Sequence, residues 1–303
     1  MNWRSVWKII HRAGDAWLDD RAPRIGAALA FYTALSLSPL LVIALAVAGM
    51  VYGEEAARGG IADRIKDLVG EPGAESIEAI LANSKKPQSG ALALSVGLIT
   101  LIIGATGVFG ELQEAMNDVW KVRPKRGRPI WTYIRTRFLS FGMVMGIGFL
   151  LVVSLGLSTI LEAVRHYVTG LLPGAALGFQ LLNLAITFLI EASLFGMIFK
   201  VLPDAKLAYR DVAFGALLTA FLFNLGKYLI ILYLSLGGVG SAFGAAGSVV
   251  ALLVWIYYST QILLFGAEVT KVVAEKAGRR IAPASGAEAI PGADTPVGKV
   301  STQ

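Results

Sequence analysis

The sequence contains no cysteine and only two histidines, His11 and His166, among its 303 residues. The absence of cysteine excludes disulfide bonds, thiolate zinc sites and cysteine nucleophiles. Two histidines are too few for a ribonuclease of the metallo-β-lactamase type, which binds its metal through a cluster of histidines and aspartates. No P-loop, GxSxG or HExxH pattern occurs either, so an ATPase or hydrolase would have no recognisable site. These absences predict a protein that is not an enzyme and that holds no metal and no cofactor.

Charged residues are also scarce. They make up 16% of the chain, against roughly a quarter in soluble domains, while hydrophobic residues make up 55%. Six apolar segments are long enough to cross a hydrocarbon core about 30 Å thick as helices. They lie at about 27–52, 90–110, 138–161, 176–199, 212–236 and 245–269. The predicted fold class is therefore all-α, a polytopic membrane protein whose six transmembrane helices lie within residues 27–281.

The segments outside the spans predict three further features. Residues 1–26 place large apolar side chains near helical spacing with basic residues between them, at Trp3, Trp7, Ile10, Trp17 and Leu18 and at Arg4, Lys8 and Arg12. This pattern favours an amphipathic helix in the membrane interface, or else a cap packed on the ends of the spanning helices. Residues 53–89 predict a loop with short amphipathic helices. Residues 282–303 are low in bulky apolar side chains and predict a disordered tail.

Lysine and arginine are distributed unevenly along the predicted topology. The segments on the same side as the termini hold twenty of the 27 basic residues, the opposite loops hold six, and Lys227 lies within a span. The positive-inside rule therefore places both termini in the cytoplasm and the loop 53–89 outside. It also accounts for the net charge of +6 without nucleic acid. We expect lipid headgroups to be met by the basic residues after the second span, Arg123, Lys125, Arg126 and Arg128.

Polar side chains recur on one side of several spans. On the sixth span, Tyr257, Gln261 and Glu268 fall within an arc of about 40°. Similar stripes occur on the first, fourth and fifth spans. Together they predict a substrate or ion pathway, formed by Tyr32, Ser36, Asn183, Thr187, Glu191, Asn224, Lys227, Tyr257, Gln261 and Glu268.

Glu191 and Lys227 are charged residues well inside their spans. An ionisable side chain near the bilayer centre costs at least about 2.5 to 3.5 kcal/mol on insertion scales, so each asks for a partner or a function. Because a short loop joins the two spans, we predict an ion pair between them. Two interpretations of the pair stay open: a contact that holds helices together, or part of a transport pathway in which Glu191 carries protons.

Four stretches of the chain resemble the YihY/BrkB family of bacterial inner-membrane proteins. They are FYTALSLSPLL, ELQEAMNDVW, LPDAKLAYRDVAFGALLTAFLF and GAAGSVVALLVWIYYSTQILLFGAEVTKV. The resemblance implies a six-span, all-helical protein of the bacterial cytoplasmic (inner) membrane. It also implies the labels the family has carried, a virulence or serum-resistance factor and, historically, ribonuclease BN. It supplies no catalytic residues, and the shortage of histidine counts against the ribonuclease.

Two functions of different classes follow. In the first, the polar stripes enclose a pathway, and the protein is a transporter or flippase of an anionic amphiphile such as a lipid or lipid-linked envelope precursor. In the second, the stripes only hold helices together, and the protein is a scaffold for cell-envelope partners. Both hypotheses take membrane lipids as partners and neither needs nucleic acid.

Overall fold

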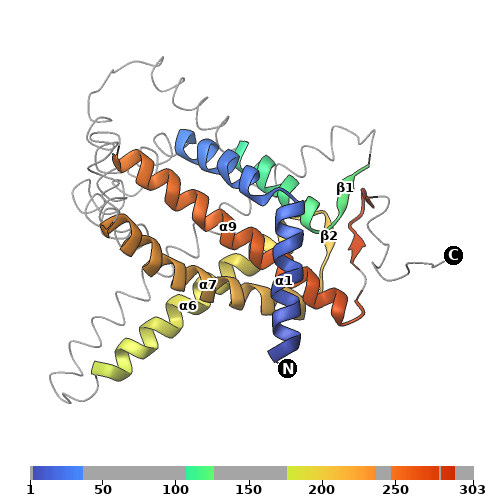
Figure 1. Ribbon diagram of the computed structural model, residues 1–303. Coiled ribbons are helices and arrows are strands. Elements are labelled where there is room, and N and C mark those ends of the chain that lie inside the picture. Colours follow the sequence, from blue (N-terminus) through green and yellow to red (C-terminus); the bar gives the residue numbers. More distant parts are fainter. Residues whose placement is uncertain (1–2, 37–106, 126–175, 237–246, 280, 291–303) are drawn as a thin grey trace, which may run out of the picture. The chain divides into compact units, whose positions relative to one another are not determined.

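A computed structural model describes residues 3–36, 107–125, 176–236, 247–279 and 281–290 (Figure 1). This part of the chain is mostly helical. Its labelled helices are α1 (Trp3–Asp19), α6 (Ala176–Val201), α7 (Tyr209–Leu236) and α9 (Gly247–Lys276), and its short strands are β1 (Val122–Pro124), β2 (Ala205–Lys206), β3 (Ala282–Pro283) and β4 (Ala287–Ala289). Residues 22–36 and 107–119 are also helical. The described residues thus agree with a predominantly helical fold.

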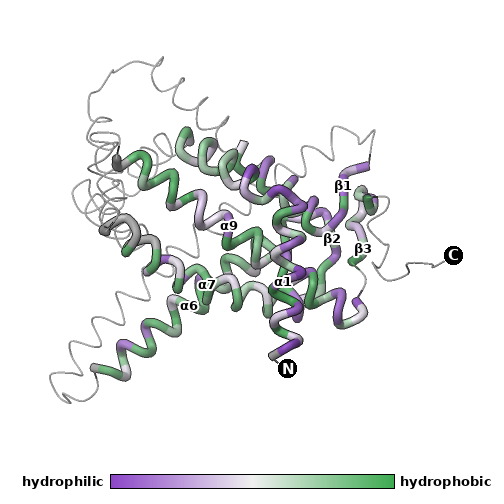
Figure 2. The backbone as a smooth tube through the Cα atoms, viewed as in Figure 1, coloured by the Kyte–Doolittle hydropathy of each residue, from purple (hydrophilic) through white to green (hydrophobic). Residues whose placement is uncertain are grey.

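Three described helices are long and apolar enough to cross a membrane. These segments, Leu177–Val201 in α6, Tyr209–Leu229 in α7 and Val249–Lys276 in α9, match the predicted fourth, fifth and sixth spans. Figure 2 shows that hydrophobic residues dominate α6, while α1 carries many hydrophilic ones. Helices 22–36 and 107–119 cover the beginning of the predicted first span and the end of the second. The predicted span at 138–161 and the loop at 53–89 lie outside the described residues.

A glycine ends α9 and directs the chain that follows. Gly278 has a φ of 71°, in the left-handed region. Its amide donates to Glu275 O, and the Arg279 amide donates to Ala274 O, which together form a Schellman motif. The turn brings the Arg279 guanidinium within 2.8 Å of the Asp211 carboxylate at the beginning of α7. The end of α9 is thereby tied to the beginning of α7.

Residues 282–290, which we expected to belong to a disordered tail, form strands instead. β4 pairs antiparallel with β1, with Arg123 opposite Glu288, and β3 pairs antiparallel with β2. The expectation is therefore wrong for these residues. The pairing depends on backbone hydrogen bonds, which small residues make as well as large ones, so low apolar bulk was not evidence of disorder. Residues 291–303 lie outside the described residues.

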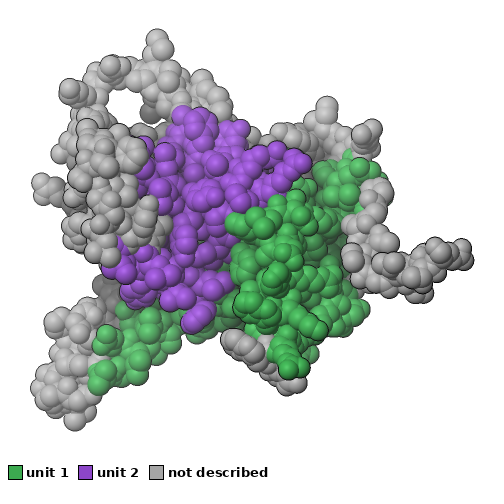
Figure 3. All heavy atoms as spheres, in the orientation of Figure 1, with its two compact units in different colours: residues 1–20, 113–220, 265–303 green, residues 21–112, 221–264 purple. Residues whose placement is uncertain are grey.

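The described chain divides into two compact units (Figure 3). The first contains α1, the strands and the end of α9, and it has a small apolar core. In that core, Ile9 and Ala13 of α1 pack against Val269 and Val272 of α9. One face of α1 thus packs on α9, one of the three candidate spans.

The second unit contains helix 22–36, the end of α7 and the first half of α9. Within it, the rings of Phe223 and Trp255 meet edge to face with their centroids 5.6 Å apart. Tyr258 of α9 lies against Gly226 of α7, where a Cβ would overlap its hydroxyl group. Small and aromatic residues therefore set the contact between α7 and α9 in this unit.

Candidate functional site

In the first unit, α7 and α9 cross through two matching glycine–threonine pairs. Thr270 of α9 fills the space above Gly215 of α7, and Thr219 of α7 fills the space above Gly266 of α9. Both threonines are fully buried. Their hydroxyl groups donate to the carbonyl oxygens of Gly266 and Gly215, four residues earlier in the same helix, at 2.6 and 2.7 Å. Absent Cβ atoms allow the close approach, and the back-bonded hydroxyls leave no unpaired donor at the contact.

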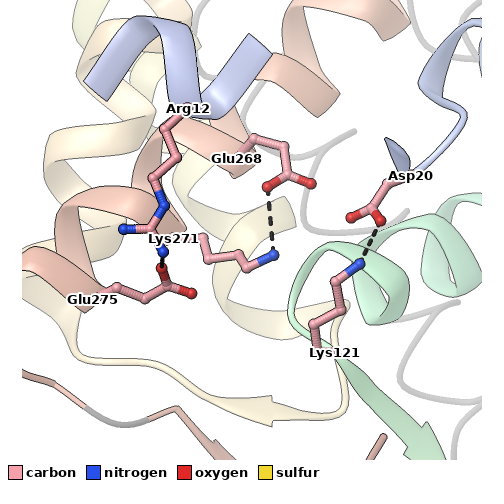
Figure 4. Close-up of polar contacts among 6 residues, drawn as sticks. All are labelled: Arg12, Asp20, Lys121, Glu268, Lys271 and Glu275. Atoms are coloured by element: carbon pink, nitrogen blue, oxygen red, sulfur yellow. Dashed lines mark hydrogen bonds and ion pairs between the residues drawn. The ribbon is translucent and has the colours of Figure 1, made fainter. Parts of the chain in front are cut away.

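Beside this crossing lies a buried charge cluster, formed by Asp20, Lys121, Glu268 and Lys271 (Figure 4). Glu268 and Lys271 come from α9, Asp20 follows α1, and Lys121 follows helix 107–119. The side chain of Glu268 is 1% exposed and that of Lys271 is 11% exposed. Lys121 pairs with Asp20, and Lys271 Nζ lies 3.6 Å from Glu268 Oε2. Asp20 and Lys121 also act electrostatically on Glu268.

The carboxyl group of Glu268 lacks hydrogen-bond donors within the charge cluster. Neither of its carboxylate oxygens accepts a hydrogen bond from a described residue, and the same is true of Asp20 Oδ2. The 3.6 Å separation from Lys271 exceeds an ordinary charge-assisted hydrogen bond, which is about 2.7 to 2.9 Å long. A buried carboxylate without close donors costs several kcal/mol. An unsatisfied buried carboxyl group calls for an explanation, and a functional role is one such explanation.

One residue of the charge cluster, Lys121, and the residue that follows Asp20 in the sequence, Arg21, have a strained backbone. Arg21 and Lys121 have φ values of 56° and 54°, which are left-handed and unusual for residues with a Cβ. Each follows the end of a helix, where glycine normally takes this conformation. At Lys121 the left-handed turn carries the side chain that pairs with Asp20. Strain kept at a position that delivers a charged group is a further mark of a functional site.

Other polar contacts of the first unit surround the charge cluster. Arg12 of α1 pairs with Glu275 of α9 at 2.8 Å. The buried Asn117 donates to Asp204 Oδ2 at 3.2 Å and accepts from the Asp204 amide at 2.7 Å. These contacts hold α1, helix 107–119, the α6–α7 connection and α9 together.

The pathway residues predicted on the first span and on α9 do not all share one environment. Gln261 donates to Ala22 O at 3.3 Å, and Gln261 and Tyr257 both lie against Gly26. Ser36 is buried and donates to Thr33 O. Tyr32 packs on Gly107, where a Cβ would lie 2.7 Å from its ring. Glu268, in contrast, belongs to the charge cluster. The stripe predicted on α9 thus divides into a helix-packing part and a charged part.

The pathway residues on α6 and α7 differ in burial. Glu191 is buried, with 9% of its surface exposed, whereas Asn183 is exposed. Thr187, Asn224 and Lys227 are intermediate. Glu191 and Lys227 belong to different compact units, and the ion pair between them stays a prediction.

The basic loop residues are described only in part. Arg123 is about half exposed and pairs with Glu288 at 2.9 Å, and Lys125 is exposed. Arg126 and Arg128 lie outside the described residues. Their contact with lipid headgroups also stays a prediction.

Sequence reasoning found Glu268 but missed its three partners. Lys271 lies beyond the predicted end of the sixth span, where a lysine is expected from the positive-inside rule alone. Asp20 and Lys121 lie in turns that are 101 residues apart. The sequence does hold one signal: Gly215 and Thr219 repeat the spacing of Gly266 and Thr270. That repetition could have predicted where α7 and α9 cross.

The apolar helices and the polar residues inside them define an integral membrane protein. Comparison with known sequences agrees, because the family described as virulence factor BrkB matches residues 13–290. The chain belongs to this family.

Its similar relatives are called UPF0761 membrane proteins. One from Pseudomonas paraeruginosa is 30% identical over 263 residues, which cover 83% of this chain and 59% of the relative. One from Haemophilus influenzae is 27% identical over 267 residues, covering 85% of this chain and 91% of the relative. The chain therefore spans well under two thirds of the Pseudomonas relatives. No solved structure matches it. Neither the family description nor these names state an enzymatic activity.

Proposed function

We propose that the protein is a transporter or flippase that moves an anionic amphiphile, a lipid or lipid-linked envelope precursor, across or within the bacterial inner membrane. The observation that carries the proposal is the charge inside the helices. Each of the three candidate spans contains an ionisable side chain in its apolar segment: Glu191 in α6, Lys227 in α7 and Glu268 in α9. Such residues are costly in lipid and characteristically mark substrate or ion pathways.

The sign of the charges supports an anionic cargo. Lys227 offers a positive charge in α7, and exposed basic residues such as Lys125 lie just outside the predicted spans, where they would gather anionic headgroups. The chain carries no nucleotide-binding or hydrolytic motif. Uphill movement would therefore draw on an ion gradient or on a partner, and the buried carboxyl groups of Glu191 and Glu268 are suited to a gradient of protons. The proposal treats the protein as a non-enzyme.

The proposal includes a placement in the membrane. Six spans would leave both termini in the cytoplasm, with α1 in the cytoplasmic interface. The position of α1 on α9 supports this. Counted from Val249 at 1.5 Å per residue, a core about 30 Å thick ends near Val269. Val269 and Val272 are the residues on which α1 packs. That contact would set α1 at the level of the headgroups.

A specific observation favours the second candidate, a non-transporting scaffold. Gln261 and Tyr257, two of the predicted pathway residues, are engaged with helix 22–36 in the second unit. Polar residues in membrane proteins often serve only to hold helices together. In the scaffold hypothesis Glu191, Lys227 and Glu268 have the same role, and the envelope partner binds elsewhere.

Reconstitution in vesicles distinguishes the two candidates. Purified full-length protein is placed in vesicles with a fluorescent anionic lipid, and its arrival in the other leaflet is followed with and without a pH gradient. We expect wild type to exceed empty vesicles by at least tenfold, Lys227→Gln and Glu191→Gln to lose most of that rate, and a zwitterionic analogue to move more slowly.

Matched controls come from exposed charges outside the spans. Glu114→Gln and Lys206→Gln remove the same charges from surface positions and should keep the wild-type rate. If wild type moves lipid no faster than empty vesicles under both conditions, the scaffold hypothesis is the better one.

A further inference from the structure

We propose that Glu268 is a proton-binding site, in which the carboxyl group is held neutral and shares its proton with Asp20. The site lies in the charge cluster at the end of α9. Burial, contacts and charge within the cluster support this site, whatever the protein transports.

Three acceptor atoms of the charge cluster lack a hydrogen-bond donor in the described part of the chain. Glu268 Oε1, Glu268 Oε2 and Asp20 Oδ2 are all buried, and none accepts a hydrogen bond from a described residue. Buried polar atoms are nearly always paired, so three unpaired acceptors in one cluster point to a missing donor. Figure 4 shows the two carboxyl groups next to each other, with the ammonium groups of Lys271 and Lys121 directed towards them. One proton on Glu268 would turn one acceptor into a donor facing another.

The two carboxyl groups of the charge cluster differ in how closely a lysine approaches them. Asp20 already has a close cationic partner in Lys121, whereas Lys271 Nζ remains 3.6 Å from Glu268. Two adjacent carboxylates repel each other in a buried site, and such pairs commonly hold one proton between them. Lys121, Lys271 and Asp20 are the charged groups that act on Glu268. A neutral Glu268 leaves Asp20 ionised and paired, so only the less buried carboxyl group keeps its charge.

The lysines of the charge cluster favour a proton over a metal cation as its ligand. Two carboxylates could also attract a metal cation, but the ammonium groups of Lys121 and Lys271 stand at the same site and would repel it. A divalent cation would have to displace or oppose Lys121 and Lys271. A proton needs no such displacement. Asp20 and Lys121 are 11% and 33% exposed, so the cluster has a wetter side through which a proton can exchange.

The thermal stability of a Glu268 variant gives the first test of the site. In Glu268→Gln, the new side chain would have the shape of the neutral carboxyl group, and its amide can donate to Asp20 as the O–H does. We therefore expect Glu268→Gln to keep the wild-type Tm in detergent. If Glu268 were an ionised partner of Lys271, this substitution would strand a buried lysine and lower the Tm. A fall in Tm, or a failure to fold, overturns the proposal.

The infrared spectrum of the full-length protein gives the decisive measurement. A protonated carboxyl group has a C=O stretching band that a carboxylate lacks. At pH 7 we expect this band to be reduced in Glu268→Gln, retained in the control Glu275→Gln, and shifted in Asp20→Asn because its hydrogen-bond acceptor is changed. Identical carboxyl bands in wild type and Glu268→Gln would overturn the proposal. Either result is independent of the vesicle assay, so a failure of transport and a failure of the proton site are separate outcomes.

Discussion

At the residue scale, the contact between α7 and α9 depends on the absence of a Cβ atom at Gly215 and at Gly266. Thr219 and Thr270 occupy the positions that a Cβ on Gly266 or Gly215 would take. A Cβ on Gly266 would lie 3.0 Å from the Cβ of Thr219, and one on Gly215 would lie 2.8 Å from the Cβ of Thr270. Both threonine side chains are fully buried, so neither can turn away without opening the helix contact.

We therefore expect Gly266→Ala to destabilise the protein by about 1 to 3 kcal/mol, the usual cost of overpacking a tight contact. The measurement is Tm in detergent. Gly14→Ala is the matched control, because a Cβ at Gly14 meets nothing within 4 Å. In the helix interior of α1 this control should be neutral or stabilising by about 0.5 to 1 kcal/mol. Equal Tm values for Gly266→Ala and wild type would show that the crossing is looser than described.

Gly278 supports a second prediction at this scale. Its φ of 71° is costly for any residue with a Cβ, by about 1 to 2 kcal/mol. Gly278→Ala should lower the Tm accordingly and loosen the turn that presents Arg279 to Asp211. Gly278→Asn should cost less, since asparagine tolerates the left-handed region better. If alanine and asparagine behave alike, strain at this position is not what limits stability.

At the element scale, α1 has more apolar surface than its own packing uses. Ile9 and Ala13 are buried on α9, but Trp7, Ile10 and Leu18 remain 58%, 44% and 60% exposed. These three lie within an arc of about 80°, between the buried face and the face that carries most of the charged residues. An exposed apolar stripe flanked by basic residues is typical of helices that lie in the membrane interface.

The absence of cysteine makes this stripe directly testable. A single cysteine placed at Ile10, labelled with a fluorophore in proteoliposomes, should be quenched by brominated lipids. The same label at Asp15, which is exposed on the charged side of α1, should be quenched much less. Equal quenching at the two positions would contradict an interfacial orientation of α1.

The strands of the C-terminal segment support a prediction about deletion. Removing residues 282–290 deletes both β3 and β4, whereas Glu288→Gln removes only the pair with Arg123, which is about half exposed. Exposed ion pairs contribute about 0 to 1 kcal/mol, so the substitution should be nearly silent. The deletion should lower the Tm clearly. If the deletion is equally silent, the strands do not contribute to the stability of the first unit.

How far the sequence predicts these elements depends on the kind of interaction. The fourth, fifth and sixth spans were predictable because apolar composition sets them directly, and α6, α7 and α9 match them. The strands were not predictable, because they pair through backbone hydrogen bonds, which depend little on the side chains. The charge cluster was predictable only at Glu268, the member that lies inside an apolar segment. Its partners Asp20 and Lys121 are brought there by turns whose left-handed residues have no sequence signal.

At the scale of the whole molecule, the topology predicts different labelling on the two sides of the membrane. Ser285, which is exposed in the turn between β3 and β4, should be cytoplasmic, and Ser84 should be outside. In intact cells, an impermeant thiol reagent should label a cysteine at position 84 but not one at position 285. Permeabilised cells should allow both. Labelling of position 285 alone in intact cells would reverse the orientation.

The paired glycines and threonines also restrict how the spanning helices can move. Sliding α7 along α9 by one turn, about 5.4 Å, would bring Thr219 from Gly266 to Ile262 or Thr270, where a side chain already fills the space. The crossing therefore prevents α7 from sliding along α9 but allows the angle between the two helices to change. Any opening and closing within the bilayer would have to tilt α7 and α9 about this point, and such a tilt would leave the separation of Glu268 and Lys271 unchanged, because both residues lie on α9.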